Sequence, residues 1–330
     1  MSESNPNEEL TVESALRPKI WDDYIGQDNI KRNLRVILDA AKKRKETPDH
    51  LLFYGQAGLG KTTLAYLVAT ELGAHLRVTS GPALEKMGDV AAILSNLEAN
   101  DVLFIDEVHR LNHLIEEVLY PAMEMRKLHM VIGKGPAART LSLDLPPFTL
   151  LAATTKAHLI SHPLRSRFGA TFKLDYYEEL DIEKIVKKSA QVLKLSIVPE
   201  AVKMIALASR FTPRVANRLL KRVRDYASVY NKEIIDAETV QAALNMLEID
   251  HLGLEPADRR LLEVVIKKFN GGPVGINTLA AAMSDDPQTI EDVYEPYLMR
   301  LSLLQRTSSG RMATPAAYKH LNLKVPDSFI

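Results

Sequence analysis

The chain has 330 residues, with 42 basic and 42 acidic side chains and no cysteine. A chain of this length exceeds one ordinary domain, so two or three compact units are expected. A net charge of zero provides no overall field that attracts nucleic acid or membranes. The absence of cysteine excludes disulfides, thiolate metal sites and a cysteine nucleophile.

Residues 1–14 form a polar N-terminal tail. It carries Glu3, Glu8, Glu9 and Glu13 but no lysine or arginine, which is the opposite of a secretory signal. No apolar run in the sequence approaches the length of a membrane span. We therefore expect a disordered tail on a cytoplasmic protein that makes no membrane contact.

A phosphate-binding loop follows the first apolar strand. Leu51–Tyr54 runs into Gly55-x-x-x-x-Gly60-Lys61-Thr62, whose glycines let backbone N–H groups point at phosphate oxygens. Lys61 reaches the β/γ-phosphates and Thr62 Oγ1 ligates Mg²⁺ in this pattern. A glycine turn beside a surface lysine is the alternative, but the strand before the loop and the apolar helix after it favour nucleotide binding. The chain is predicted to bind ATP or ADP with Mg²⁺.

A second motif suggests hydrolysis of the triphosphate. Val102–Ile105 is an unbroken apolar run that ends in Asp106 and Glu107, at the carboxyl end where parallel sheets place their ligands. Asp106 would hold Mg²⁺ through water, and Glu107 would orient the attacking water. An acidic pair capping the next helix is the alternative. After a phosphate-binding loop, the hydrolytic interpretation is the stronger one.

The first half of the chain alternates apolar strands with amphipathic helices. The strands are expected at Leu51–Tyr54, Leu76–Thr79, Val102–Ile105 and Thr149–Ala153. This alternation predicts an α/β domain over residues 15–177, with a parallel sheet and flanking helices. Thr155 follows the fourth strand, where a hydroxyl can sense the γ-phosphate.

A two-stranded hairpin is expected at about residues 127–146, before the fourth strand. Its apolar positions alternate with polar or small ones: Leu128, Met130, Ile132, Leu141 and Leu143. This apolar face either packs on its own domain or binds a partner protein.

The second half of the chain is mostly helical. Helix-period segments predict a small all-α domain at residues 178–248. Residues 254–330 then show helices, a turn and a pair of short strands, which is the order of a winged helix. Its expected recognition segment, Asp285–Glu295, is acidic and would be repelled by phosphates. Arg306 and Arg311 on the wing are the expected DNA contacts, and phosphate contacts carry no sequence information.

Two further arginines are candidates for the nucleotide site. Arg167 follows the strand whose end faces the phosphates, which fits an arginine finger given to a neighbouring subunit. A solvated charge or a local ion pair is the alternative. Arg214 opens a helix after Thr212-Pro213 and is a candidate to fold the helical domain over the nucleotide.

These motifs resemble, in the same order, those of the RuvB family of AAA+ ATPases. The shared stretches are Leu16–Pro18, Tyr24–Gln27, the phosphate-binding loop, Thr79–Pro82, Ile105–Arg110, Pro121–Glu124, Ile132–Arg139, Pro163–Gly169, Ala216–Leu220, Gly271–Gly275 and Glu295–Leu298. The resemblance implies an AAA+ ATPase domain, a helical lid and a winged-helix head. It also implies a homohexamer on double-stranded DNA at Holliday junctions, working with RuvA and RuvC in recombination and the repair of DNA damage.

The resemblance also implies residue roles. The adenine pocket would be formed by Leu16, Arg17, Ile25 and Tyr177, and the phosphate and Mg²⁺ contacts by Gly58, Gly60, Lys61, Thr62 and Thr63. Arg167 resembles the finger in trans, Arg214 the second sensor, and the hairpin the docking site for RuvA. Phe211 departs from the family, which usually has glycine there.

The predicted function is therefore that of an ATP-hydrolysing DNA translocase driving Holliday-junction branch migration. A clamp-loader-like ATPase is the alternative within the same class, although it typically lacks the winged helix and the apolar hairpin. An ATP-switched, initiator-like DNA-binding protein is the alternative from another class. The acidic Asp285–Glu295 segment argues against it.

Overall fold

The computed structural model describes residues 15–132 and 139–326. Contacts within the chain divide it into two compact units. The first holds the chain up to Leu193 together with Phe211–Asn217, and the second holds Lys194–Arg210 and the chain from Arg218 onward. In the described residues, no helix is long and apolar enough to cross a membrane.

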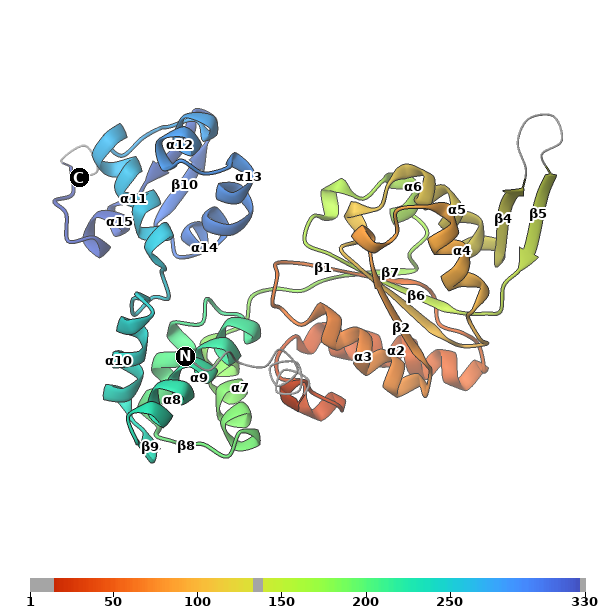
Figure 1. Cartoon of the computed structure of the whole chain (residues 1–330), viewed down its shortest axis with the longest axis horizontal. Coiled ribbons are helices and arrows are strands. Elements are labelled where there is room, and N and C mark those ends of the chain that lie inside the picture. Colours follow the sequence, from red (N-terminus) through yellow and green to blue (C-terminus); the bar gives the residue numbers. More distant parts are fainter. Residues whose placement is uncertain (1–14, 133–138, 327–330) are drawn as a thin grey trace. The chain divides into compact units, whose positions relative to one another are not determined.

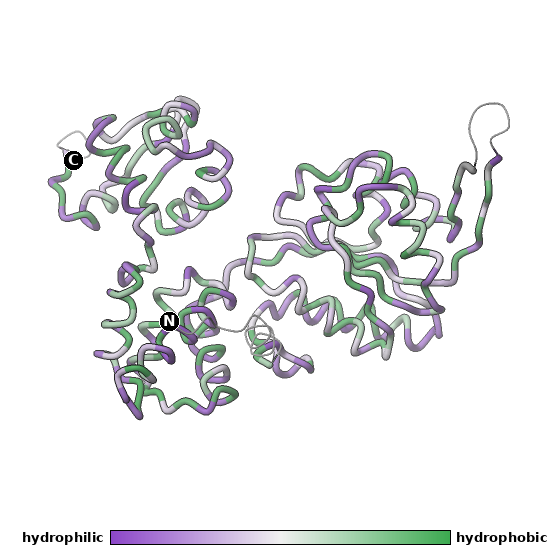
Figure 2. The backbone as a smooth tube through the Cα atoms, in the orientation of Figure 1, coloured by the Kyte–Doolittle hydropathy of each residue, from purple (hydrophilic) through white to green (hydrophobic). Residues whose placement is uncertain are grey.

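A five-stranded parallel sheet forms the centre of the first unit, in the order β2-β3-β6-β1-β7. The strands are β1 (Leu51–Tyr54), β2 (Leu76–Ser80), β3 (Val102–Asp106), β6 (Thr149–Thr154) and β7 (Ala170–Lys173). The middle strands are mostly apolar, as Figure 2 shows, and β6 and all but the last residue of β3 are buried because both faces of the sheet are covered. The predicted α/β sheet is confirmed, and β7 is a strand that the sequence analysis missed.

Helices cover this sheet (Figure 1). They are α2 (Asp28–Arg44), α3 (Lys61–Leu72), α4 (Met87–Ser95), α5 (His113–Met125) and the short α6 (His162–Arg165). One buried cluster joins strand residues such as Leu103 and Leu150 to Leu94 of α4 and Leu119 of α5. Because β6 pairs parallel with both β1 and β3, the carboxyl ends of these three strands lie at one edge of the sheet.

The hairpin consists of β4 (Lys127–Ile132) and β5 (Arg139–Asp144), paired antiparallel with Leu128 opposite Leu143. Strand β4 continues directly from α5 (Figure 1). The expectation that Leu128 belongs to a partner-binding face is wrong, because its side chain is fully buried in the core of its own unit. Met130 and Leu143 pack partly against that core, whereas Leu141 is 40% exposed. The side chain of Ile132 lies outside the described part.

The predicted helical lid contains four helices and a two-stranded parallel pair. They are α7 (Glu179–Val192), α8 (Pro199–Leu207), α9 (Pro213–Val229), α10 (Ala237–Met246), β8 (Ser196–Ile197) and β9 (Ile234–Ile235). The division of the chain runs through this region. Helix α7 and the first residues of α9 lie with the first unit, and the remainder lies with the second.

The winged helix lies in the second unit. Its elements are α11 (Pro256–Phe269), α12 (Ile276–Met283), α13 (Pro287–Thr289), a π-helical turn (Ile290–Tyr294), α14 (Glu295–Arg300), β10 (Leu304–Thr307), β11 (Gly310–Ala313) and α15 (Pro315–His320). The helical stretch from Pro287 to Arg300 thus widens into a π-turn at Ile290–Tyr294. Pro296 explains this, because it has no N–H to donate to the carbonyl four residues earlier.

Candidate functional site

The phosphate-binding loop connects β1 to the N-terminus of α3. Gly60 immediately precedes α3 with φ +99°, and a Cβ there would lie 2.8 Å from the Tyr24 hydroxyl. Gly55 has φ +146°, and its missing Cβ would lie 2.5 Å from the carbonyl oxygen of Leu174. Both positions therefore require glycine. Free N–H groups of the first turn of α3 are available to an anion, and this turn includes Thr62 and Thr63.

Lys61 lies folded back on the loop. Its Nζ donates hydrogen bonds of 2.8 Å to the carbonyl oxygens of both Gly55 and Gln56. The residue is only 8% exposed, and this burial lowers the pKa of the Lys61 ammonium to about 8, although the charges of Asp106 and Glu107 oppose the shift. The ammonium is thus held without a full counter-charge, and an added polyphosphate would supply one.

Two acidic residues end β3 next to this loop. Asp106 Oδ2 lies 3.4 Å from Thr62 Oγ1, and Asp106 Oδ1 accepts a 2.9 Å hydrogen bond from the Glu107 N–H. Glu107 has a left-handed backbone (φ +49°), which turns the chain sharply after the strand. Its side chain makes a 3.4 Å ion pair with Arg110. The predicted grouping of Thr62, Asp106 and Glu107 is present.

The oxygen donors fit Mg²⁺, which prefers hard oxygen ligands. Thr62 Oγ1 and Asp106 Oδ2 would hold the ion, directly and through water. Within the described residues, no cluster of three or more His, Asp or Glu side chains could hold a metal.

The end of β6 lies between the two motifs, because β6 pairs with both β1 and β3. The Thr154 hydroxyl lies 2.9 Å from His109 Nδ1 and accepts a 2.9 Å hydrogen bond from the Lys156 N–H. Thr155, the predicted sensor, is the next residue and is half-buried. His109 was missed by the sequence analysis, although it follows the acidic pair by only two residues.

A second group of side chains packs behind the loop. The Tyr177 hydroxyl lies within hydrogen-bond distance of the Tyr24 hydroxyl (3.2 Å) and of the carbonyl oxygen of Leu59 (3.3 Å). Burial raises the pKa of Tyr177 to about 12, so this hydroxyl is neutral. Ile25 follows Tyr24 and is half-buried. Of these two predicted pocket residues, Tyr177 therefore contacts the loop, and Ile25 neighbours Tyr24 in the chain.

Leu16 and Arg17 begin the described part of the chain. Leu16 is half-buried. The guanidinium of Arg17 lies over the ring of Tyr66 on α3, 4.3 Å from its centroid. This contact places Arg17 against the helix that starts at Lys61.

The predicted second sensor also lies at the loop. The Arg214 N–H donates to the carbonyl oxygen of Gly58 (3.4 Å). A Cβ on Gly58, whose φ is +81°, would lie 3.0 Å from Cβ of Arg214. The start of α9 thus rests on the phosphate-binding loop.

Arg167 is held by its own unit. It donates to the carbonyl oxygen of Pro163 (2.6 Å), pairs with Glu124 (3.1 Å) and lies over the Tyr120 ring, 4.4 Å from its centroid. Its Nε is buried and, among the described residues, has no hydrogen-bond partner. An orphaned donor on a positioned guanidinium is compatible with a finger for a neighbouring copy.

The two wing arginines differ. Arg306 is on β10 with a 55% exposed side chain, although it lies 3.2 Å from a carboxylate oxygen of Glu291. Arg311 is only 5% exposed and pairs at 2.6 Å with both Glu295 and Glu291. The expectation that Arg311 contacts DNA is therefore corrected. Its side chain is buried, and its charge is paired with two carboxylates of the same domain.

Comparisons with known proteins agree along the chain. Residues 16–174 match the Holliday junction DNA helicase RuvB P-loop domain, residues 177–250 the RuvB AAA lid domain, and residues 251–322 the RuvB C-terminal winged helix domain. The solved structure of Thermotoga maritima RuvB, a Holliday junction branch migration motor, is 47% identical, with a TM-score of 0.86 over 94% of this chain and 100% of that chain. Two variants of that protein match with TM-scores of 0.85 and 47% identity, over 94% of this chain and 99% of theirs. The chain belongs to the RuvB family.

Proposed function

We propose that this protein is an ATP hydrolase that drives branch migration of Holliday junctions. The observation that carries the proposal is the grouping at the carboxyl edge of the sheet. The buried ammonium of Lys61 lacks a full counter-charge, and Thr62 and Asp106 form a pair of oxygen donors. Glu107 directly follows Asp106 at the end of β3. These groups bind phosphate, hold Mg²⁺ and orient a water, which is what triphosphate hydrolysis requires. Bound Mg²⁺ would neutralise charge on the phosphates.

The working form is proposed to be a homohexamer. Arg167 makes its contacts with Pro163, Tyr120 and Glu124 and leaves one donor unused. A finger that stabilises transition-state charge in the adjacent subunit would make each site depend on assembly. A homohexamer would place one such finger at every interface between neighbouring copies.

Duplex DNA is proposed to bind at the wing without sequence specificity. Residues 305–309 of the wing turn are exposed, and Arg306 is the arginine there that is free enough to reach a phosphate. The acidic side chains of Asp285 and Asp286 begin the recognition segment and repel the phosphates that flank the major groove. Contact through phosphates suits movement along arbitrary sequence.

The outer part of the hairpin is proposed to dock RuvA, and the assembly to deliver junctions to RuvC. Leu141 supports this because it is 40% exposed beside the half-buried Met130 and Leu143. An apolar side chain kept in solvent on a hairpin gains from burial against a partner. Leu128 at the base of the hairpin has no part in this surface.

The test of the hydrolytic site is Glu107→Gln, with Glu117→Gln as the matched control on an exposed ion pair with His113. Glu107→Gln should bind ATP normally, hydrolyse it very slowly and leave junctions unmoved in the presence of RuvA. Glu117→Gln should match the unmodified protein. Normal turnover by Glu107→Gln would remove the assignment of Glu107. Hydrolysis by the unmodified protein without junction movement would remove the motor function.

A further inference from the structure

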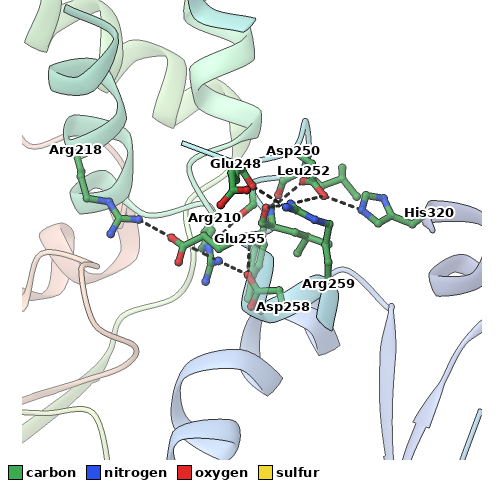
Figure 3. Close-up of polar contacts among 12 residues, drawn as sticks. Arg210, Arg218, Glu248, Asp250, Leu252, Glu255, Asp258, Arg259 and His320 are labelled. Atoms are coloured by element: carbon green, nitrogen blue, oxygen red, sulfur yellow. Dashed lines mark hydrogen bonds and ion pairs between the residues drawn. The ribbon is translucent and has the colours of Figure 1, made fainter. Parts of the chain in front are cut away.

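Arg210 is anchored to the winged helix. Its guanidinium pairs with the carboxylate of Asp258 in the first turn of α11 and donates to the carbonyl oxygen of Gly253 at 3.0 Å. It also lies over the ring of Tyr297 on α14, 5.1 Å from the centroid. Figure 3 shows Arg210 and Asp258 pointing toward each other.

Asp258 depends on this arginine. Its residue is completely buried, and its Oδ1 has no hydrogen-bond partner in the part of the chain that the structure describes. Its Oδ2 accepts from Arg210 and from the backbone N–H of Glu255. Burial raises the pKa of Asp258, while Arg210 opposes the rise. Separating a buried carboxylate from its one cationic partner is strongly unfavourable, so Asp258 and Arg210 are expected to move together.

The residues immediately after Arg210 are anchored to the nucleotide site. The carbonyl oxygen of Phe211 accepts a 3.1 Å hydrogen bond from the N–H of Tyr177, and the N–H of Arg214 reaches the oxygen of Gly58. Arg210 and Phe211 both have left-handed backbones, each with φ +55°. Left-handed backbone is unfavourable for residues other than glycine, so two in succession mark a sharp turn of the chain between the two sets of contacts.

We infer that Arg210 is a positioning residue that passes nucleotide-dependent movement at the phosphate-binding loop to the DNA-binding winged helix. A shift of Arg214 when nucleotide binds reaches Arg210 through only three intervening residues of backbone, and Arg210 is bound to the winged helix through Asp258 and Gly253. The inference rests on the proposed ATP-driven function and adds a route from the nucleotide site to the DNA-binding winged helix.

Other contacts make the joint between lid and winged helix stiff. Arg259 donates to the carbonyl oxygen of Leu254 (2.6 Å). It also donates to the carbonyl oxygen of Glu248 (2.8 Å), and His320 bonds to Asp250 (2.8 Å), as Figure 3 shows. These contacts hold residues 248–259 against the rest of the winged helix. A displacement of Arg210 therefore moves the winged helix as a body and is not absorbed in the linker.

The experiment uses the full-length protein and measures two quantities. The first is the protection of amides in residues 251–322 from hydrogen exchange, with and without a non-hydrolysable ATP analogue and without DNA. The second is the number of ATP molecules hydrolysed per base pair of junction migration. Arg210→Ala and Asp258→Asn should hydrolyse ATP within about twofold of the unmodified rate but raise this ratio at least about fivefold, the lower end of typical coupling between sites. They should also lose the nucleotide-dependent change in protection.

Arg218→Ala is the matched control, because Arg218 pairs with Glu255 at the same joint but on an exposed surface (2.9 Å). It should leave both quantities unchanged. Arg210→Lys keeps the charge and should restore part of the coupling, which a purely structural loss would not predict. The inference would be overturned if folded Asp258→Asn kept the unmodified ratio of ATP hydrolysed per base pair. It would also be overturned if Arg218→Ala raised this ratio as much as Arg210→Ala does. An unmodified protein that moves no junctions would refute the proposed function instead, while the exchange measurement would still decide the inference.

Discussion

The buried ammonium of Lys61 makes ATP binding depend on pH. Burial places the pKa of Lys61 at about 8 in the protein alone, and contact with polyphosphate raises it because a nearby negative charge favours the charged form. Binding therefore takes up a proton when the pH lies above the pKa of the free protein. ATP affinity should fall as the pH rises through this value.

The size of the effect follows from the fraction of protein already protonated. At about pH 7, roughly 90% of Lys61 carries its proton, and at about pH 9, roughly 10% does. The dissociation constant for Mg·ATP should therefore increase about ninefold over this range, which corresponds to about 1.3 kcal/mol of binding free energy. An unburied lysine, with an ordinary pKa of about 10.4, would give almost no change over the same range.

Fluorescence titration of a labelled ATP at intervals across this range measures the constant directly. Isothermal calorimetry in two buffers of different ionisation enthalpy measures the proton uptake. Lys61→Arg is the control, since a guanidinium stays charged throughout, and its affinity should be flat with pH even if it is weaker. A flat profile for the unmodified protein, with no proton uptake at about pH 9, would refute the reasoning about Lys61.

Three further outcomes are expected. Arg306→Ala should weaken binding to unrelated duplexes equally and flatten the plot of log affinity against log salt by about 0.9 per lost phosphate contact; a sequence-dependent loss in fluorescence anisotropy would indicate base reading. Arg311→Ala should instead destabilise the protein by about 3–5 kcal/mol in urea unfolding, because it leaves buried Glu295 unpaired, and a loss below about 1 kcal/mol would contradict this. Burial lowers the pKa of His50 in the folded protein. The free energy of unfolding that neutral His50 contributes is therefore complete above about pH 6.5 and is lost as the pH falls toward the lower folded pKa. If His50→Gln loses as much stability in acid as the unmodified protein, His50 is not the source.

Much of the nucleotide site is predictable because the residues within each of its two main motifs are close in sequence. The loop from Gly55 to Thr62 and the Asp106-Glu107 pair each follow an apolar strand, and parallel pairing brings such strand ends to one edge. Strand β7 was missed because its side chains alternate between buried and exposed, and it is only four residues long. A short edge strand of this kind has no apolar run to mark it.

The wrong predictions concern which side chains of a sequence pattern are buried in the folded protein. Alternation at Leu128 and Leu141 identifies an apolar face, but only the structure shows that the first is fully buried and the second is 40% exposed. Likewise, the charge of Arg311 is visible in sequence, whereas its partners Glu291 and Glu295 lie 20 and 16 residues away. Tertiary pairing of this kind leaves no local signal.

The position of Phe211–Asn217 in the first unit has a consequence for synthesis. The ATPase part of the chain is complete in sequence near residue 174, yet the segment that rests on Gly58 follows α8 and is made about forty residues later. On a ribosome adding roughly 5–20 residues each second, the sheet can form seconds before its nucleotide site is covered. Any ATP bound by the nascent chain in that interval meets a phosphate-binding loop that lacks Arg214. A chain released before residue 217 would keep the α/β core but not the finished site.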